Sequence, residues 1–315
     1  MTTARNVLAA DIGGTLMRAA VVDAEGRVLA RDAVATEPER GIDDAARRLA
    51  ALFGQVTVEA GEPPIAAAGV STAGPLDPIT GTYRYPPNLL GWHGASMRPV
   101  LEPALGVPVA IGHDATLAAL AEAHYGQHRG SQHLVYLTVS TGIGAGIFAH
   151  GRPITGHSGG AGEAGHMIVQ PGGPSCGAGC PGCLEGVSSG SGIAAAARRA
   201  VAAGAQTTLT ADAEARDVFA AAAAGDTVAR EIIEQAIEGL ATGLADLLAL
   251  LDPEMVVLGG GVMRALEPWW DRLLARTQEI ALPRYTDGVP VARTALGDDA
   301  SLLGASVIAF EALHR

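Results

Sequence analysis

Two segments of the chain repeat one pattern, in which a strand enters a glycine-rich turn and a second strand leaves it. The first spans Val7 to Asp23 with the turn D-I-G-G-T, and the second spans Leu134 to Phe148 with the turn S-T-G-I-G. Alternating apolar residues predict strands, and glycine lets the backbone approach a ligand closely. One such turn is common. Two of them half a chain apart predict a duplicated architecture with a cleft between the halves and two phosphate-binding loops.

The rest of the chain alternates between strand and helix patterns. Apolar runs predict strands over residues 65–71, 107–111 and 254–258. Helical patterns are found over residues 43–53, 114–124, 191–203, 213–224, 227–251 and 301–313. This alternation is typical of α/β proteins, in which helices cover the faces of sheets. A chain of 315 residues is long enough for two domains with buried cores.

The basic residues restrict how the chain can bind phosphate. All 21 of them are arginine, so the chain has no lysine. A Walker-type phosphate loop and Schiff-base chemistry both need a lysine amine, and both are excluded. A phosphate site must therefore use backbone N–H groups, helix N-termini, a metal ion or arginine.

The net charge and the apolar pattern indicate which partners to expect. The formal charge of −12 opposes binding to nucleic acids and to anionic membranes, so small molecules and protein partners are expected. The most apolar window, residues 239–251, contains Asp246 and is too short to span a bilayer. No basic segment followed by a long apolar run precedes Asp11, and a cytoplasmic protein is expected.

All three cysteines lie in one short segment near a histidine. His166 stands ten residues before Cys176, and Cys180 and Cys183 follow. Three thiolates and an imidazole can supply a closed tetrahedral zinc site. The alternative is three unrelated thiols in a glycine-rich loop, with a disulfide only in an oxidising compartment. The clustering favours zinc, and the metal would also hold Glu163 and Glu185 in place.

Eight motifs in order resemble the ROK (repressor, open reading frame, kinase) family of sugar kinases, within the actin-like ATPase superfamily. They are D-I-G-G-T at Asp11, A-G-P-L-D at Ala73, P-N at Pro87, H-D-A at His113, S-T-G-I-G-A-G at Ser140, G-E-A-G-H at Gly162, C-x3-C-x2-C-L-E at Cys176 and G-G-G-V at Gly259. The resemblance covers nearly the whole chain, and the cysteine-rich segment is its most specific part.

The resemblance implies a two-domain α/β fold of the actin-like (ribonuclease H-like) type, with sugar and ATP in the cleft. The expected domains are residues 1–112 with 301–315, and residues 113–300 with the zinc loop. A homodimer or a dimer of dimers is also expected. The implied activity is transfer of the γ-phosphate of ATP to the 6-hydroxyl of a hexose, with glucose preferred.

The family's roles are carried onto matching positions. Asp114 would be the catalytic base, and Asp11 would hold Mg²⁺ through water. Phosphate or nucleotide contacts are implied for Gly13, Gly14, Thr15, Thr141, Gly142, Gly260 and Gly261. Sugar contacts are implied for Asn88, His113, Asp114, Glu163, His166 and Glu185. Zinc ligands are implied at His166, Cys176, Cys180 and Cys183, and His166 can serve both zinc and sugar through its two ring nitrogens.

This chain departs from the family pattern at two places. The family usually carries E-N-D-A-N where this chain has residues 112–116, so His113 replaces an asparagine that contacts a sugar hydroxyl. The usual second cysteine is replaced by Ala178, and Cys180 lies two residues further on. Cys180 is expected to replace it as a ligand, because the number of ligands then stays at four.

Three of these residues also have simpler alternative roles, and the chain has alternative functions. Asp114 can be a helix N-cap, Asn88 a turn residue and Glu185 a cap after the zinc loop. An N-acetylglucosamine or N-acetylmannosamine kinase is the main alternative. A non-catalytic sugar-binding protein should have lost Asp114 or a phosphate loop. A repressor needs a DNA-binding domain ahead of Asp11, where the sequence has ten residues.

Overall fold

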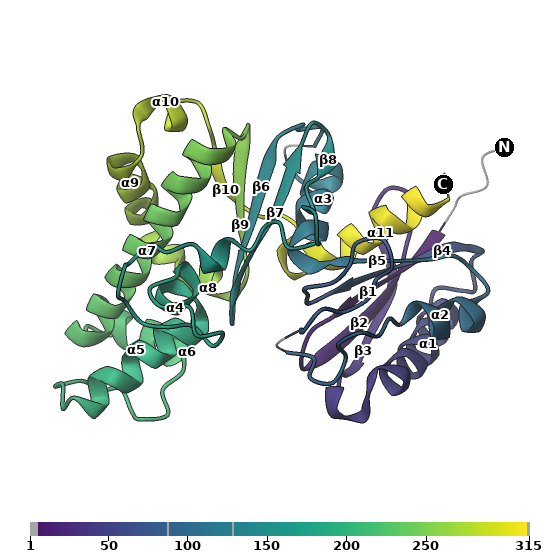
Figure 1. Cartoon of the computed structure of the whole chain (residues 1–315), viewed down its shortest axis with the longest axis horizontal. Helices are drawn as coiled ribbons and strands as arrows, with labels where there is room; N and C mark the ends of the chain where they lie inside the picture. The colour runs from purple at the N-terminus through teal and green to yellow at the C-terminus, as the bar shows by residue number, and fades with distance from the viewer. Residues whose placement is uncertain (1–5, 87, 128, 314–315) are drawn as a thin grey trace. The chain divides into compact units, whose positions relative to one another are not determined.

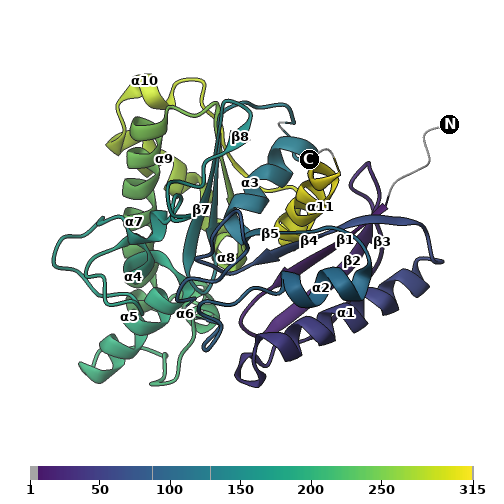
Figure 2. The same cartoon turned by 45° about the vertical axis from the view of Figure 1, so that its right-hand side comes forward.

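The computed structural model describes residues 6–86, 88–127 and 129–313, which form two compact units (Figures 1 and 2). Unit 1 consists of residues 1–132, 146–162 and 295–315, and unit 2 of residues 133–145 and 163–294. The predicted domain division after residue 112 stays a prediction. The compact unit that contains residue 112 continues to residue 132.

Unit 1 is built on a five-stranded sheet with the order β3-β2-β1-β4-β5. Its strands are β1 (Asn6–Ile12), β2 (Leu16–Val22), β3 (Val28–Ala35), β4 (Ile65–Thr72) and β5 (Val109–His113). The first three strands form an antiparallel meander, and β1, β4 and β5 run parallel. The sheet is therefore mixed, and the parallel part brings the carboxyl ends of three strands to one edge.

Helices cover both faces of this sheet. They are α1 (Ile42–Glu59), α2 (Arg98–Leu105), α3 (Asp114–Tyr125) and α11 (Ala300–Ala312), with 3-10 turns η1 (Pro38–Arg40) and η4 (Gly297–Asp299). Leu49 and Phe53 of α1 share one buried cluster with Leu8 and Ala10 of β1. On the other face α11 packs on β1, β4 and α3 (Figure 1). A Cβ on Gly69 would lie 1.9 Å from the Ala305 carbonyl oxygen, so glycine permits the close approach of β4 to α11.

The second sheet has the order β10-β9-β6-β7-β8. Its strands are β6 (Leu134–Val139), β7 (Ile143–Ala149), β8 (Arg152–Pro153), β9 (Met255–Gly259) and β10 (Val291–Arg293). Strands β6, β9 and β10 run parallel, and β8 pairs with β7 antiparallel.

The buried core of unit 2 combines strand residues with helices, and its longest helix is α7 (Thr227–Leu251). The other helices are α4 (Leu184–Ser188), α5 (Gly190–Ala202), α6 (Ala215–Ala223), α8 (Gly261–Ala265), α9 (Trp270–Ile280) and α10 (Pro283–Thr286), with 3-10 turns η2 (Ala164–His166) and η3 (Glu267–Trp269). Asp226 caps α7, because its carboxylate accepts the N–H groups of Ala229 and Thr208. These backbone donors, with the N–H of Thr208 first, hold the pKa of Asp226 well below its usual value.

The predicted strands and helices are all found, with their limits shifted by a few residues. The strand expected over 107–111 lies at Val109–His113, and the helix expected over 43–53 continues to Glu59. No helix in the described residues has a long enough apolar stretch to cross a bilayer.

Candidate functional site

The parallel strands of unit 1 bring predicted site residues to one edge of the sheet. Asp11 of β1 pairs with Ser71 of β4, which pairs with Gly112 of β5. One residue further along, Thr72 pairs with His113, and Asp114 follows as the first residue of α3. Polar residues at the carboxyl ends of neighbouring parallel strands are a common arrangement for ligand binding in α/β proteins.

Asp11 is held from two sides. Its carboxylate accepts hydrogen bonds from the Arg18 guanidinium at 2.7 Å and from the Ser71 hydroxyl at 2.9 Å. Arg18 also lies 3.6 Å from the Asp299 carboxylate. Asp11 therefore has a fixed orientation and a cation beside it. Arg18, Ser71 and Asp299 were not predicted as site residues. The absence of lysine was the available signal, since it left arginine as the only side-chain cation for a phosphate site.

The backbone donors of the first glycine turn differ in their partners. The N–H of Gly13 donates to the Leu16 carbonyl at 3.0 Å and closes the hairpin. The Thr36 hydroxyl binds the Gly13 carbonyl at 2.7 Å. Among the described residues, no backbone carbonyl accepts the N–H groups of Gly14 and Thr15, so these donors are suited to an anion.

Asn88 lies directly beside this turn. A Cβ on Gly14 would be 3.1 Å from the Asn88 carbonyl oxygen and 3.2 Å from its Cβ. Asn88 itself is exposed, and Pro87 of the same motif lies outside the described residues. The predicted phosphate turn and the predicted sugar residue are thus in contact within unit 1.

Asp114 begins α3, and His113 occupies the N-cap position. The Asp114 carboxylate accepts the N–H of Ala115 at 2.7 Å and lies 3.4 Å from Nε2 of His113. Its side chain is 39% exposed, so it is available to a ligand. A carboxylate in the first turn is stabilised by the positive end of the helix dipole. The alternative that Asp114 is the N-cap of α3 is therefore wrong, because His113 holds that position; the Asp114 carboxylate is held by the Ala115 N–H and is still accessible.

Unit 2 brings the second glycine turn to two other predicted segments. The N–H groups of Gly190 and Ser191, at the start of α5, donate to the carbonyls of Ser140 and Thr141 at 2.8 and 3.1 Å. Gly260 has a φ of 97°, and a Cβ there would lie 2.3 Å from the Val139 carbonyl. Only glycine fits this position. Because Val139 comes two residues before Thr141, the turn at Gly260–Gly261 is a neighbour of the turn at Thr141–Gly142.

Glu185 is tied to the same turn. Its carboxylate accepts the backbone N–H of Ile143 at 2.9 Å, and a Cβ on Gly142 would lie 2.6 Å from its Oε2 atom. Glu185 lies in the first turn of α4, while Cys183 is the N-cap and its sulfur accepts the N–H of Gly186. The simple capping role suggested for Glu185 is thus filled by Cys183.

The cysteine segment contains a group of possible metal ligands. One ligand atom each from His166, Cys176 and Cys183 lie within 4.8 Å of one another, and Nδ1 of His166 is 3.8 Å from Sγ of Cys176. Zinc prefers these donors, and with bonds of about 2.0–2.3 Å its tetrahedral ligand atoms lie roughly 3–4 Å apart. The three residues therefore fit zinc. Cys180 is not in this group; its sulfur lies 3.7 Å from the His166 carbonyl oxygen.

The two ring nitrogens of His166 lie next to different side chains. Nδ1 faces Cys176, and Nε2 lies 3.9 Å from the Glu163 carboxylate. The two side chains are each 39% exposed. One imidazole thus joins the possible metal ligands to a carboxylate that was predicted to bind sugar.

Comparison with known proteins decides the family. The ROK family model matches residues 7–312. The chain belongs to the ROK family. A glucokinase of Thermotoga maritima is 32% identical over 96% of each chain, and an N-acetylmannosamine kinase of Citrobacter koseri is 35% identical over 96% of this chain and 98% of its own. The crystal structure of a ROK hexokinase from Thermus thermophilus has a TM-score of 0.84 at 38% identity, covering 98% of this chain and 99% of that one.

These relatives establish this ROK protein as a sugar kinase with the actin-like ATPase fold that the motifs predicted. ATP is accordingly its nucleotide. The relatives carry three different names, glucokinase, N-acetylmannosamine kinase and hexokinase, so the sugar is a separate question. Among the predicted site residues, unit 1 gathers Asp11, Gly14, Asn88, His113 and Asp114. Unit 2 gathers Thr141, Gly142, Glu163, His166, Glu185 and Gly260.

Proposed function

We propose that this kinase transfers the γ-phosphate of ATP to the 6-hydroxyl of glucose. Asp114 is the base: the O6–Pγ bond forms, the bond from Pγ to the β-phosphate oxygen breaks, and the hydroxyl proton passes to the Asp114 carboxylate. The observation that carries this assignment is the position of Asp114, an accessible carboxylate fixed at a helix N-terminus by Ala115 and next to His113. Proton transfer to such a group typically accelerates a reaction by roughly 10²–10⁴-fold.

The other residues bind and orient the two substrates. Asn88, His113, Glu163, His166 and Glu185 supply amide, imidazole and carboxylate groups that suit sugar hydroxyls. The phosphates are received by Gly13–Thr15 and Thr141–Gly142, with the nucleotide near Gly260–Gly261. Within the first turn, the Gly14 and Thr15 N–H groups are better placed for this than that of Gly13, which closes the hairpin.

Two metals have separate roles in the proposal. Mg²⁺ would be held through water by Asp11, where it would neutralise phosphate charge. Because Arg18 already bonds to Asp11, the cation would share this carboxylate with the guanidinium. Zinc would be structural, held by His166, Cys176 and Cys183, with Cys180 as the fourth ligand because it is the one remaining thiol of the chain.

An N-acetylmannosamine kinase is the second candidate, and the 35% identity to such an enzyme supports it. The test is ADP release with ATP and Mg²⁺ across glucose, mannose, fructose, allose, N-acetylglucosamine and N-acetylmannosamine. We expect the highest kcat/KM with glucose. A higher kcat/KM with N-acetylmannosamine would replace glucose by the second candidate, and no turnover with any sugar would contradict both.

We also infer a homodimer, as in the sequence-based expectation, from the resemblance to the family. Sedimentation of the purified chain tests this directly. A single species at the mass of one chain would contradict it.

A further inference from the structure

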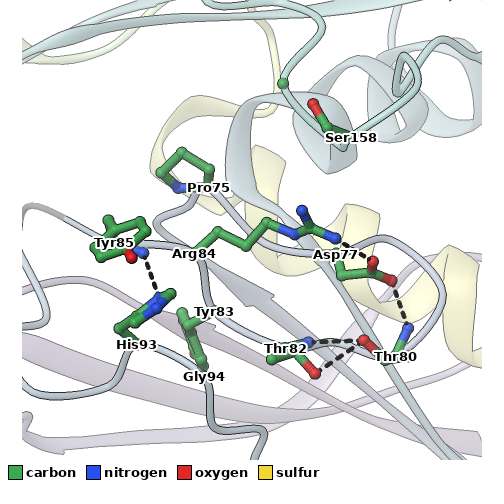
Figure 3. Close-up of a pocket in the computed structure, with 11 residues that line it drawn as sticks. Pro75, Asp77, Thr80, Thr82, Tyr83, Arg84, Tyr85, His93, Gly94 and Ser158 are labelled. Carbon is green, nitrogen blue, oxygen red and sulfur yellow. Dashed lines mark hydrogen bonds and ion pairs between the residues drawn. The ribbon is translucent and has the colours of Figure 1, made fainter.

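Unit 1 has a pocket of about 640 Å³ that the proposed kinase mechanism does not use (Figure 3). Its walls come from the loop between β4 and α2 and from the segment after β8. The lining residues are Pro75, Asp77, Thr80, Thr82, Tyr83, Arg84, Tyr85, His93, Gly94, Ser158 and Gly160. Pockets for small molecules typically measure about 300–1,000 Å³. The volume is therefore sufficient for a small ligand.

The charges in this pocket are matched and held in place. The Asp77 carboxylate accepts the N–H groups of Ile79 and Thr80 at 3.0 Å each and the Arg84 guanidinium at 2.8 Å. These donors, with the N–H of Thr80 first, hold the pKa of Asp77 well below its usual value. Arg84 is the only arginine among the lining residues, and Asp77 neutralises it. An ionic ligand would have to compete with this pair, so the pocket is suited to a neutral one.

An aromatic pair forms one side of the pocket. The rings of Tyr85 and His93 are stacked, with centroids 3.6 Å apart and planes 16° from parallel. The Tyr85 N–H donates to Nδ1 of His93 at 3.2 Å, which leaves the neutral imidazole proton on Nε2. Tyr85 has a φ of 52° and is 78% exposed. The Tyr85 ring thus stacks on His93 from a sparsely populated backbone conformation, and most of the residue is open to a ligand.

Hydroxyl groups line the remainder of the pocket. Thr80 donates its hydroxyl proton to the hydroxyl oxygen of Thr82 at 2.8 Å, so Thr82 can donate its own proton to a ligand. Figure 3 shows Ser158 across the pocket from these two threonines, with the Arg84 side chain between them. A flat aromatic surface beside several hydrogen-bonding groups fits a molecule with an apolar face and many hydroxyls. We infer that this pocket is a second carbohydrate site, which binds a neutral sugar without phosphorylating it.

This second site shares a chain segment with the proposed substrate site. Pro75 lines the pocket, and a Cβ on the preceding Gly74 would lie 2.4 Å from Cδ2 of His113. Asn88 follows Tyr85 by three residues. Any effect of a sugar at one place on the affinity of the other place must be reciprocal and equal in size. This coupling rests on the proposed function, but the binding site itself does not.

The experiment counts the sugar bound by the full-length chain without nucleotide, using equilibrium dialysis with labelled glucose, N-acetylmannosamine and maltose. We expect two equivalents of at least one sugar for the unsubstituted chain and one for Tyr85→Ala, or at least tenfold weaker binding of the second equivalent. Thr82→Val, which keeps the side-chain shape, should weaken the same equivalent. Ile79→Ala is the matched control, because Ile79 is 82% exposed on the same loop and does not line the pocket.

The outcomes separate this inference from the kinase assignment. One equivalent of every sugar that is undiminished in Tyr85→Ala, or two undiminished equivalents in that variant, would overturn the second site even if the kinase is active. Two equivalents that fall to one in Tyr85→Ala support it even if no sugar is phosphorylated. Calorimetric melting of each variant checks that the fold is retained.

Discussion

The Glu185 carboxylate accepts a hydrogen bond of 2.9 Å from the backbone N–H of Ile143. Ile143 begins β7 directly after Thr141 and Gly142, while Glu185 comes two residues after Cys183. The bond therefore joins the cysteine segment to the second glycine turn within unit 2. Loss of order in the cysteine segment should therefore also disturb the predicted phosphate contacts at Thr141 and Gly142.

Substitution of Glu185 distinguishes its hydrogen bond to the Ile143 N–H from its proposed contact with the sugar. Glu185→Ala should lower kcat/KM for ATP by about 10–100-fold, because hydrogen bonds to charged groups are worth about 1.5–3 kcal/mol. Glu185→Gln keeps an acceptor for Ile143 and should retain the KM for ATP while raising that for sugar. Steady-state kinetics with each substrate varied in turn measures this. Equal effects of the two substitutions on the KM for ATP would contradict the link to the turn.

Metal content tests the ligand set. Cys176→Ser and Cys183→Ser should each purify with little zinc and melt at a lower temperature, because structural zinc contributes directly to folding. Cys180→Ser should keep zinc but lose it to a chelator at lower concentration, because the three residues that already lie together, His166, Cys176 and Cys183, all remain. Elemental analysis and chelator titration measure both effects. Unchanged zinc retention in Cys180→Ser would remove Cys180 from the set, and zinc-free unsubstituted protein would remove the metal.

Alanine substitutions of Gly14 and of Gly13 can be compared to test the contact between the first turn and Asn88. Gly14→Ala would place a Cβ 3.1 Å from the Asn88 carbonyl, tighter than ordinary contact, so Asn88 must move. Gly13→Ala meets nothing nearer than the Leu16 carbonyl at 3.6 Å. We expect Gly14→Ala to raise the KM for sugar several-fold and Gly13→Ala to change it little. If both variants raise only the KM for ATP, the contact with Asn88 has no role in sugar binding.

The fold followed from local patterns wherever strands and helices are amphipathic or buried. Alternation and glycine turns predicted both hairpins, and the long apolar α7 was predicted with its limits unchanged. The predicted outline omitted several elements, among them β3 and α9. β3 alternates between partly and fully exposed residues, and α9 has few buried side chains, so neither has an apolar run that stands out.

The site was predicted through motifs, and its neighbours were missed because contacts depend on register. Nothing local in the sequence indicates that Ser71 lies opposite Asp11, since this depends on the parallel pairing of β1 with β4. The same is true of Arg18, which reaches Asp11 across the antiparallel pairing of β1 with β2. The cysteine motif is local, so its spacing predicted that His166, Cys176 and Cys183 would lie close together, whereas the position of Cys180 outside this group could not be predicted. That these residues bind zinc stays a prediction.

Removal of the Asp114 carboxylate should abolish most of the turnover while the sugar still binds. Asp114→Asn keeps the size of the side chain and an acceptor for the Ala115 N–H, so α3 should form normally. We expect kcat to fall by about 10²–10⁴-fold, the usual contribution of a general base. Kinetics and sugar binding are measured on the same preparation. A kcat within a few-fold of the unsubstituted enzyme would exclude Asp114 as the base.

Asp226 should make unit 2 less stable as the pH falls into the acid range. Its N–H donors favour the ionised form, so its pKa is lower in the folded chain than the ordinary value of 3.8. A group with a lowered folded pKa stabilises the fold fully above the unfolded pKa and loses that contribution as the pH falls through the folded pKa. The contribution of Asp226 should therefore be complete near neutral pH and decline below about pH 4.

Asp226→Asn is the matched variant, because asparagine is also a good N-cap but has no charge to lose. The unsubstituted chain should melt at a higher temperature than the variant near neutral pH, and the difference should shrink as the pH falls below about 4. Asp77 also has a lowered pKa, but both proteins retain it, so its effect cancels in the comparison. Calorimetry over the same pH series measures the difference, and a gap that stays constant or widens in acid would show that the Asp226 charge does not stabilise α7.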